Sequence, residues 1–177
     1  SAGSGGAVHV ASSAVFNAIR CDLAGNSSGQ NGGALSILSN ASIVDCNFVD
    51  NIAAGDGGSL SAERYIDLEA QAEAYEAGLE YVPETIDVSI TGTRFAESQG
   101  VYGGALYFYD PNTAKITDCN VAANTAQSGG GVYVEFGNIS IDKSNIAGNK
   151  AEDEYAIGGG IAAMSASALI NDTKIQN

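Results

Sequence analysis

Tryptophan is absent from the sequence, and proline, methionine and histidine occur only two, one and one times in 177 residues. The single histidine, His9, excludes His-based catalytic triads and zinc sites built from several histidines. Seven basic residues against 21 acidic ones give a formal charge of −14. We therefore expect no nucleic-acid partner, because phosphate binding needs a basic face. There is no run of about 18 apolar residues and no recognisable signal peptide, so we expect contact with a membrane only through a region outside this sequence.

Glycine, in contrast, occurs 23 times, and 45% of the residues are hydrophobic. This is too much glycine for a helical protein and too apolar a composition for a disordered one. The glycines recur in pairs, each followed by a small or apolar residue and then by a mostly larger apolar one. In chain order these tetrads are Gly5-Gly6-Ala7-Val8, Gly32-Gly33-Ala34-Leu35, Gly57-Gly58-Ser59-Leu60, Gly103-Gly104-Ala105-Leu106, Gly130-Gly131-Val132-Tyr133 and Gly159-Gly160-Ile161-Ala162.

A second landmark alternates with the glycine pairs: a large apolar residue followed three positions later by a polar one, mostly asparagine. It occurs as Leu23-Asn26, Phe48-Asn51, Phe95-Ser98, Val121-Asn124 and Ile146-Asn149, and Ile175 begins a sixth copy that the sequence does not complete. Two positions before the large residues stand Cys21, Cys46, Thr93, Cys119, Ser144 and Thr173. Five positions before them stand Ala18, Ile43, Ile90, Ile116, Ile141 and Ile170.

Six aligned copies with a period of about 25 residues leave few architectures. Leucine-rich repeats would show a regular leucine pattern, and ankyrin or tetratricopeptide repeats would need two helices in each copy. The pattern predicts an all-β fold, a right-handed parallel β-helix of about six rungs, with glycines at corners and the isoleucine and large apolar rows in the core. We expect the asparagines to form an internal ladder of stacked amides that also satisfies the turn backbone.

Residues 1–177 are thus predicted to form a single β-helix domain. Neither end carries a cap, although a bare solenoid end exposes strand edges and apolar rows. We therefore expect a fragment of a longer solenoid, or a chain that stacks end to end into a filament.

The two landmarks together resemble the repeat of the chlamydial polymorphic outer membrane proteins. That family is marked by Gly-Gly-Ala followed by Ile, Leu or Val, and by Phe-x-x-Asn. The first motif stands here at residues 5–8, 32–35 and 103–106, and the second at 48–51. The resemblance spans nearly the whole chain and implies a right-handed β-helical passenger domain of an autotransporter, used for adhesion at the cell surface.

One block, residues 62–87, interrupts the repeat and is predicted to be an acidic helical insertion. Residues 63–87 hold eight acids and one arginine, half of the net charge. The spacing of Tyr65, Leu68, Ala72, Tyr75 and Leu79 predicts one apolar stripe, beside which Glu69, Glu73, Glu76 and Glu80 form an acidic one. The helix either lies on the solenoid with its apolar stripe down or projects as a recognition element. The candidate interaction surface comprises Tyr65, Glu69, Glu73, Tyr75, Glu76 and Glu80.

A second, smaller insertion is the acidic segment at residues 150–157, which we expect on the same edge as the first. The sequence also allows two covalent modifications, a disulfide and N-glycosylation. Cys21 and Cys46 occupy equivalent positions in adjacent rungs, within disulfide range, although the column also reads as a row of small inward residues. Sequons begin at Asn26, Asn40, Asn138 and Asn171, and the candidate glycosylation sites are Asn40, Asn138 and Asn171.

The enzymatic alternative depends on the charged column three positions before the large apolar residues. Asp45, Asp118 and Asp172 share it with Arg20 and Lys143, and carboxylates on alternate rungs would meet glycosidase spacing. The mixed signs equally fit a solvated charge column. A flat ice-binding or mineral-binding face would need a repeated Thr-x-Thr column, which occurs once, in residues 90–93.

The function predicted from the sequence is that of a non-enzymatic, cell-surface or secreted passenger or structural domain, which mediates adhesion or protein–protein assembly. Its expected location is extracellular or on the outer cell surface. Its expected partners are a protein or glycan on a cell surface, or neighbouring subunits, and we expect neither cofactor nor metal. The alternative is a carbohydrate-active β-helix fragment, similar to a pectate lyase, acting on polysaccharide.

Overall fold

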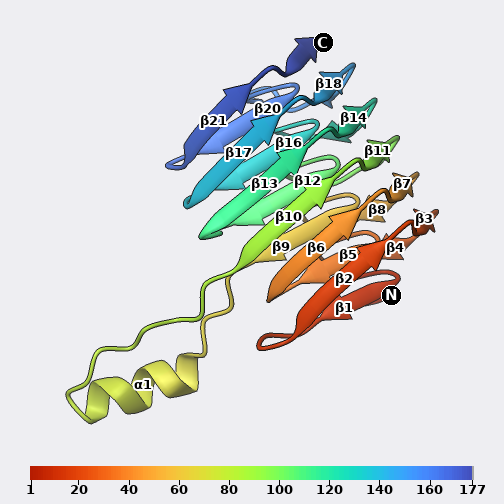
Figure 1. The fold of residues 1–177 in the computed structure, drawn as a ribbon. Helices are drawn as coiled ribbons and strands as arrows, with labels where there is room; N and C mark the ends of the chain where they lie inside the picture. Colours follow the sequence, from red (N-terminus) through yellow and green to blue (C-terminus); the bar gives the residue numbers. More distant parts are fainter. Residues whose placement is uncertain (177) are drawn as a thin grey trace.

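The computed structural model describes residues 1–176 as a stack of short parallel strands wound into a solenoid (Figure 1). Three six-stranded parallel sheets run the length of the stack and enclose its core. One short helix, α1, leaves the stack on two extended limbs. The predicted all-β parallel β-helix is therefore confirmed.

Each rung contributes one strand to each of the three long sheets. Sheet A contains β1 (Val8–Val10), β5 (Leu35–Ile37), β9 (Leu60–Glu63), β12 (Leu106–Tyr109), β16 (Val132–Glu135) and β20 (Ile161–Met164). Sheet B contains β2 (Val15–Ile19), β6 (Asn40–Val44), β10 (Asp87–Thr91), β13 (Thr113–Thr117), β17 (Asn138–Asp142) and β21 (Ser167–Asn171).

Sheet C closes the third side, and two short pairs extend the corner that follows it. Sheet C contains β3 (Asp22–Ala24), β7 (Asn47–Val49), β11 (Arg94–Ala96), β14 (Asn120–Ala122), β18 (Asn145–Ala147) and β22 (Lys174–Gln176). The pairs are β4 (Ser27–Ser28) with β8 (Ile52–Ala53), and β15 (Thr125–Ala126) with β19 (Lys150–Ala151).

Alternate residues of each strand point inward, so equivalent residues of successive rungs stack on each other. In the middle rungs the predicted isoleucine and large apolar rows are fully buried, as Ile90 and Phe95 show. The rings of Phe48 and Phe95 stack with centroids 4.8 Å apart, the spacing of neighbouring strands. At the two end rungs the same rows are partly open, and Ile170 and Ile175 are 41% and 45% exposed.

The predicted asparagine ladder is present inside the corner that follows sheet C. The Asn124 amide group donates to the carbonyl of Phe95 (3.2 Å) and to Oδ1 of Asn149 (2.9 Å), while its own Oδ1 accepts from the backbone N–H of Ser98 (3.0 Å). Asn51 repeats the pattern with Leu23 and Asn26. Each buried amide therefore satisfies a backbone N–H of the turn and also contacts a carbonyl of the strand before that turn.

The glycine pairs form the corner that leads into sheet A, and the two members have different roles. Gly32 has φ +66°, a left-handed conformation that side chains with a Cβ rarely adopt. Gly33 lies so close to the next rung that a Cβ there would overlap the carbonyl oxygen of Gly58. The pair therefore allows both a sharp turn and a close stacking of corners.

In the last two rungs the glycine alignment predicted from the sequence is wrong by one residue. Both rungs carry glycine triplets, and the left-handed residues are Gly129 and Gly158, the first of each triplet. Val132 therefore pairs with Leu106 in the register of sheet A. Tyr133, predicted to be equivalent to the inward Leu106, lies instead on the outer face of the sheet, and Ala162 is displaced in the same way.

Candidate interaction surface

The insertion between β9 and β10 projects from the corner between sheets A and B (Figure 1). Its helix, α1, spans Leu68–Glu76. The carboxylate of Asp67 caps the helix by accepting from the backbone N–H groups of Glu69 and Ala70, both at 3.0 Å. At the other end Gly78 takes φ +69° and stops the helix. The sequence therefore defines both ends of this short helix by an N-cap and a glycine stop.

No residue of α1 is buried. Leu68, Tyr75 and Leu79 of the apolar stripe are 72%, 85% and 69% exposed. The interpretation in which this stripe lies against the solenoid is therefore wrong, because the limbs carry the helix away from the sheets (Figure 1). The residues of the candidate interaction surface are all exposed: Tyr65, Glu69, Glu73, Tyr75, Glu76 and Glu80.

Although the helix projects, the base of the insertion is fixed to the solenoid. The hydroxyl of Ser13, in the turn between β1 and β2, donates to both carboxylate oxygens of Glu84 at 3.0 and 3.2 Å. Arg64 pairs with Asp110 of the adjacent rung at 2.6 Å. These contacts join both limbs of the insertion to the corner from which α1 projects.

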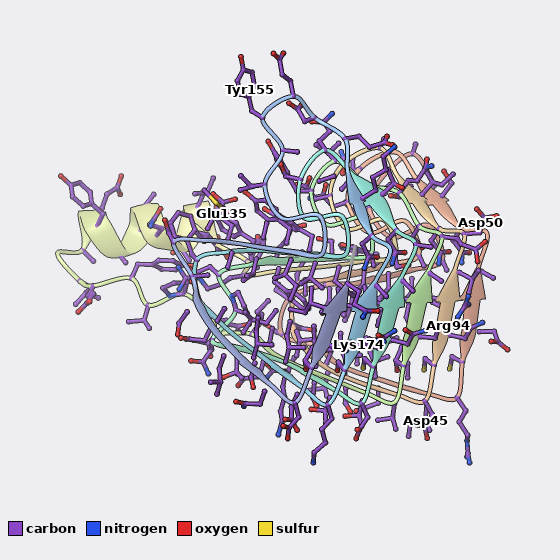
Figure 2. The ribbon with its side chains drawn as sticks, turned by 90° about the horizontal axis from the view of Figure 1, so that it is seen from above. Asp45, Asp50, Arg94, Glu135, Tyr155 and Lys174 are labelled. Carbon is purple, nitrogen blue, oxygen red and sulfur yellow. The ribbon has the colours of Figure 1, made fainter. Side chains whose placement is uncertain are left out.

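The second acidic insertion lies at a different corner from the first. Residues 152–160 connect β19 to β20 at the entrance to sheet A, whereas the α1 insertion leaves at its exit. Figure 2 shows Tyr155 at the tip of this projecting loop, well away from α1. The expectation of a shared edge is therefore wrong, and the outer face of sheet A lies between the two projections.

The charged column considered for catalysis is a row of left-handed corners between sheets B and C. Arg20, Asp45, Asp118, Lys143 and Asp172 all have φ between 43° and 53°, and the glycine of the row, Gly92, has φ +61°. Aspartate and glycine are favoured in this conformation, so turn geometry accounts for the composition of the column. All these side chains are exposed at the surface.

Of the two alternatives for the cysteine column, the structure has the row of small inward residues, and the candidate Cys21–Cys46 disulfide is not formed. All three cysteines are free. Sγ of Cys46 accepts from the backbone N–H of Cys21 (3.4 Å), just as the hydroxyl of Ser144 accepts from the N–H of Cys119 (3.1 Å). The thiols thus serve as turn-capping groups. Burial raises the pKa of Cys46 and Cys119, which disfavours their reactive thiolate forms.

Of the four sequons, three begin at exposed asparagines on the outer side of sheet B, namely Asn40, Asn138 and Asn171. Asn26 is half-buried and donates to Asn51 in the ladder. Nδ2 of Asn138 donates to the carbonyl of Asn112 at 3.0 Å. A glycan on Asn138 would require this contact to break.

An open recess of about 570 Å³ lies over the outer face of sheet B. Apolar atoms make up most of its lining, hydroxyl and amide side chains are interspersed among them, and its charged members are Asp87 and Lys115. Such groups can accept and donate hydrogen bonds to sugar hydroxyls. The recess contains one carboxylate, whereas glycoside hydrolysis requires two.

A cluster on the outer face of sheet A was not predicted from the sequence. It consists of Tyr102, Tyr107 and Tyr133 with the carboxylates of Asp56, Glu63 and Glu135. Inside–outside alternation along Leu106–Tyr109 would have placed Tyr107 outside. The one-residue error at the glycine triplets hid the cluster, because it placed Tyr133 in the core.

Among residues 1–176, no group of three or more His, Cys, Asp or Glu side chains is arranged to hold a metal. The helix found in this part of the chain has nine residues and is too short to span a membrane. Comparisons of the chain with protein-family models, with curated proteins and with solved structures found no match.

Proposed function

We propose that this protein is a non-enzymatic adhesion or assembly module, in which the solenoid is a rigid scaffold and the α1 insertion contacts a partner protein. The observation that carries the proposal is the exposure of the apolar residues of the insertion, in α1 and in the limb that follows it. Leu68, Tyr75, Leu79 and Val82 are each at least 69% exposed. A soluble helix normally buries its apolar stripe, so a displayed one favours contact with another molecule.

The charge around the insertion indicates the kind of partner. Four glutamates, Glu69, Glu73, Glu76 and Glu80, surround the apolar residues and are exposed. None of them forms an ion pair with another residue among 1–176. A partner with apolar residues ringed by lysine or arginine would complement this surface. A second copy of this acidic chain would instead bring like charges together.

The proposed location is extracellular or on the outer surface of a cell, in an arrangement like an autotransporter passenger. Support comes from the resemblance of the Gly-Gly-Ala and Phe-x-x-Asn motifs to the polymorphic outer membrane protein repeat, combined with the β-solenoid fold. A rigid rod that presents a recognition element at its side is well suited to contact between surfaces.

The proposal is tested by screening immobilised proteins and glycans with the labelled chain. The comparison is a variant in which residues 66–84 are replaced by Gly-Gly, which keeps Arg64 and the buried Ile86. We expect the labelled wild-type chain to bind immobilised basic proteins that the labelled variant does not bind. The double substitution Leu68→Ser, Tyr75→Ser should weaken the same interactions while leaving the charge unchanged. Retention that is identical for the wild type and the replaced variant would refute a role for the insertion.

The second candidate function, action on a polysaccharide, is supported by the hydrogen-bonding recess over sheet B. Asp87 and Lys115 would then face the sugar chain together with the hydroxyls of Ser42 and Ser89, which lie on neighbouring strands. Incubation with polygalacturonate, followed by ultraviolet detection of unsaturated products, tests this candidate. Product that disappears in the Lys115→Ala variant would favour it over the adhesion module.

A further inference from the structure

Three tyrosines form a contiguous aromatic surface on the outer face of sheet A. Tyr107 of β12 pairs with Tyr133 of β16 in the sheet register, and their ring centroids lie 5.9 Å apart with planes 24° from parallel. Tyr102, from the corner before β12, lies over Tyr133 with centroids 4.9 Å apart. Tyr102 is 39% exposed, whereas Tyr107 and Tyr133 are 6% and 7% exposed. The surface therefore has two buried rings and one that faces solvent.

Carboxylates from three segments border these rings, and together with them form the tyrosine–carboxylate site. Asp56 lies in the corner before β9, Glu63 at the end of β9 and Glu135 at the end of β16. Asp56 accepts from the backbone N–H of Tyr102 (3.1 Å), and Glu63 accepts from the amide of Asn31 (2.8 Å). No lysine or arginine among residues 1–176 pairs with any of the three. Their negative charge is uncompensated within the described chain.

The hydroxyls of Tyr107 and Tyr133 form no hydrogen bond with another residue among 1–176. Both residues are more than nine-tenths buried as a whole, but neither hydroxyl is among the fully buried polar atoms that lack a partner, so both hydroxyls reach the surface. Burial, with the charges of Asp56, Glu135 and Glu63, raises the pKa of Tyr107 far above its ordinary value, so its hydroxyl stays neutral. Burial, followed by repulsion from Glu63 and Glu135, likewise raises the pKa of Asp56. Two neutral hydroxyls beside several carboxylates can therefore accept from a donor on a ligand that approaches this face.

The site shares one residue, Glu63, with an open recess over the first rungs. The outward residues of sheet A are small in β5 and β9, where Ser36 and Ser61 stand in the column that Tyr107 continues. The recess, of about 480 Å³, is lined by His9, Ser36 and Glu63 among others, and none of the three tyrosines lines it. In Figure 2, Glu135 lies on the side of the solenoid between α1 and the loop of Tyr155. A chain segment approaching this face would pass between the two acidic projections.

We infer that the tyrosine–carboxylate site binds the guanidinium group of an arginine presented by a partner protein. A guanidinium is planar and stacks on tyrosine rings, and its five N–H donors can reach several acceptors at once. Tyr102 supplies the exposed ring, Asp56 and Glu135 supply anionic acceptors, and the Tyr107 hydroxyl supplies a further acceptor. A bare metal ion is disfavoured, because no three ligating side chains among residues 1–176 are grouped to hold one.

This inference rests on the proposed function, since it assumes a protein partner, and it names the chemistry recognised. The residues of the tyrosine–carboxylate site all lie outside residues 66–84, the segment that is replaced by Gly-Gly in the test of the α1 insertion. The two ideas can therefore fail separately: the α1 replacement can abolish partner retention while arginine binding persists, or the reverse.

The test is a titration of the chain with acetyl-Gly-Arg-Gly-amide, followed through the NMR signals of the tyrosine rings. Peptides with lysine or with neutral citrulline in place of arginine are the matched ligands, and chitotetraose is the neutral sugar. We expect saturable shifts of the Tyr102 and Tyr133 signals with the arginine peptide. Lysine should bind at least fivefold more weakly, and citrulline or the sugar should cause no shift.

Variants separate the site from general attraction to an acidic protein. The double variant Asp56→Asn, Glu135→Gln should weaken arginine binding at least tenfold, whereas Asp45→Asn, Asp118→Asn at exposed corners between sheets B and C removes the same charge and should change it less than twofold. Tyr102→Ala, at an exposed ring, provides a second test should the first variant unfold, and we expect a loss of at least fivefold. Equal weakening by the site and corner variants, equal binding of arginine and citrulline, or shifts caused only by the sugar would each overturn the inference.

Discussion

Replacing Asn124 by alanine provides a sharp test of what holds the rungs together. The side chain is fully buried and serves three groups: the N–H of Ser98, the carbonyl of Phe95 and Oδ1 of Asn149. Alanine leaves the buried N–H of Ser98 without a partner, at about 1–3 kcal/mol, and removes two further hydrogen bonds of about 1 kcal/mol each. We expect the free energy of unfolding to fall by about 3–5 kcal/mol, with a fall of roughly 10 °C in the thermal midpoint.

The matched control is Asn120→Ala, four residues earlier in the same rung. Asn120 points outward from β14, and its amide oxygen accepts from Nδ2 of Asn145 at 2.8 Å. Loss of one hydrogen bond at the surface should lower the free energy of unfolding by less than about 1 kcal/mol. Urea unfolding followed by circular dichroism measures both variants, and hydrogen exchange of the Ser98 amide should accelerate only in Asn124→Ala. Equal destabilisation of the two variants would refute the ladder as a stabilising element.

Three further outcomes follow from the structure. Gly33→Ala should destabilise the fold by at least about 2 kcal/mol in urea unfolding, because the added Cβ meets the carbonyl of Gly58, whereas Gly3→Ala, with open space around it, should have little effect. Above pH 10 the unfolded state releases the Tyr107 proton while the folded state keeps it, so stability should fall as the pH rises; Tyr107→Phe should flatten that fall, and an unchanged slope would contradict it. Replacement of residues 66–84 by Gly-Gly should shift the thermal midpoint by less than roughly 3 °C, since α1 buries nothing, and a loss above 10 °C would show that the insertion supports the core.

The repeat predicted the fold because its periodic residues are the ones on which the solenoid depends. Only a position at which every rung needs the same property shows a period, and the core, the asparagine ladder and the glycine corners are such positions. The period could not fix the strand register after a glycine triplet. Either of the two adjacent glycine pairs in a triplet satisfies the pattern, and only pairing with the neighbouring rung selects Gly129 as the left-handed residue.

The α1 insertion and the tyrosine–carboxylate site were harder to predict from the sequence, for two physical reasons. Whether α1 lies flat or projects depends on where its limbs are fixed, and the contact of Ser13 with Glu84 joins residues 71 positions apart. The tyrosine–carboxylate site is assembled from three rungs whose outward residues differ, so no repeat marks it. Residues outside the repeat are the least predictable from periodicity and the most informative about binding.

The insertion leaves the strands on both sides of it undisturbed. β9 and β10 pair with their neighbours in the same register as the other rungs, with Leu60 opposite Leu106 and Ile90 opposite Ile116. The exit corner of sheet A thus tolerates a long excursion without a change in the core. Natural variation could exchange the displayed segment at this position while the scaffold is inherited intact, and a designer could graft a different binding peptide there by the same route.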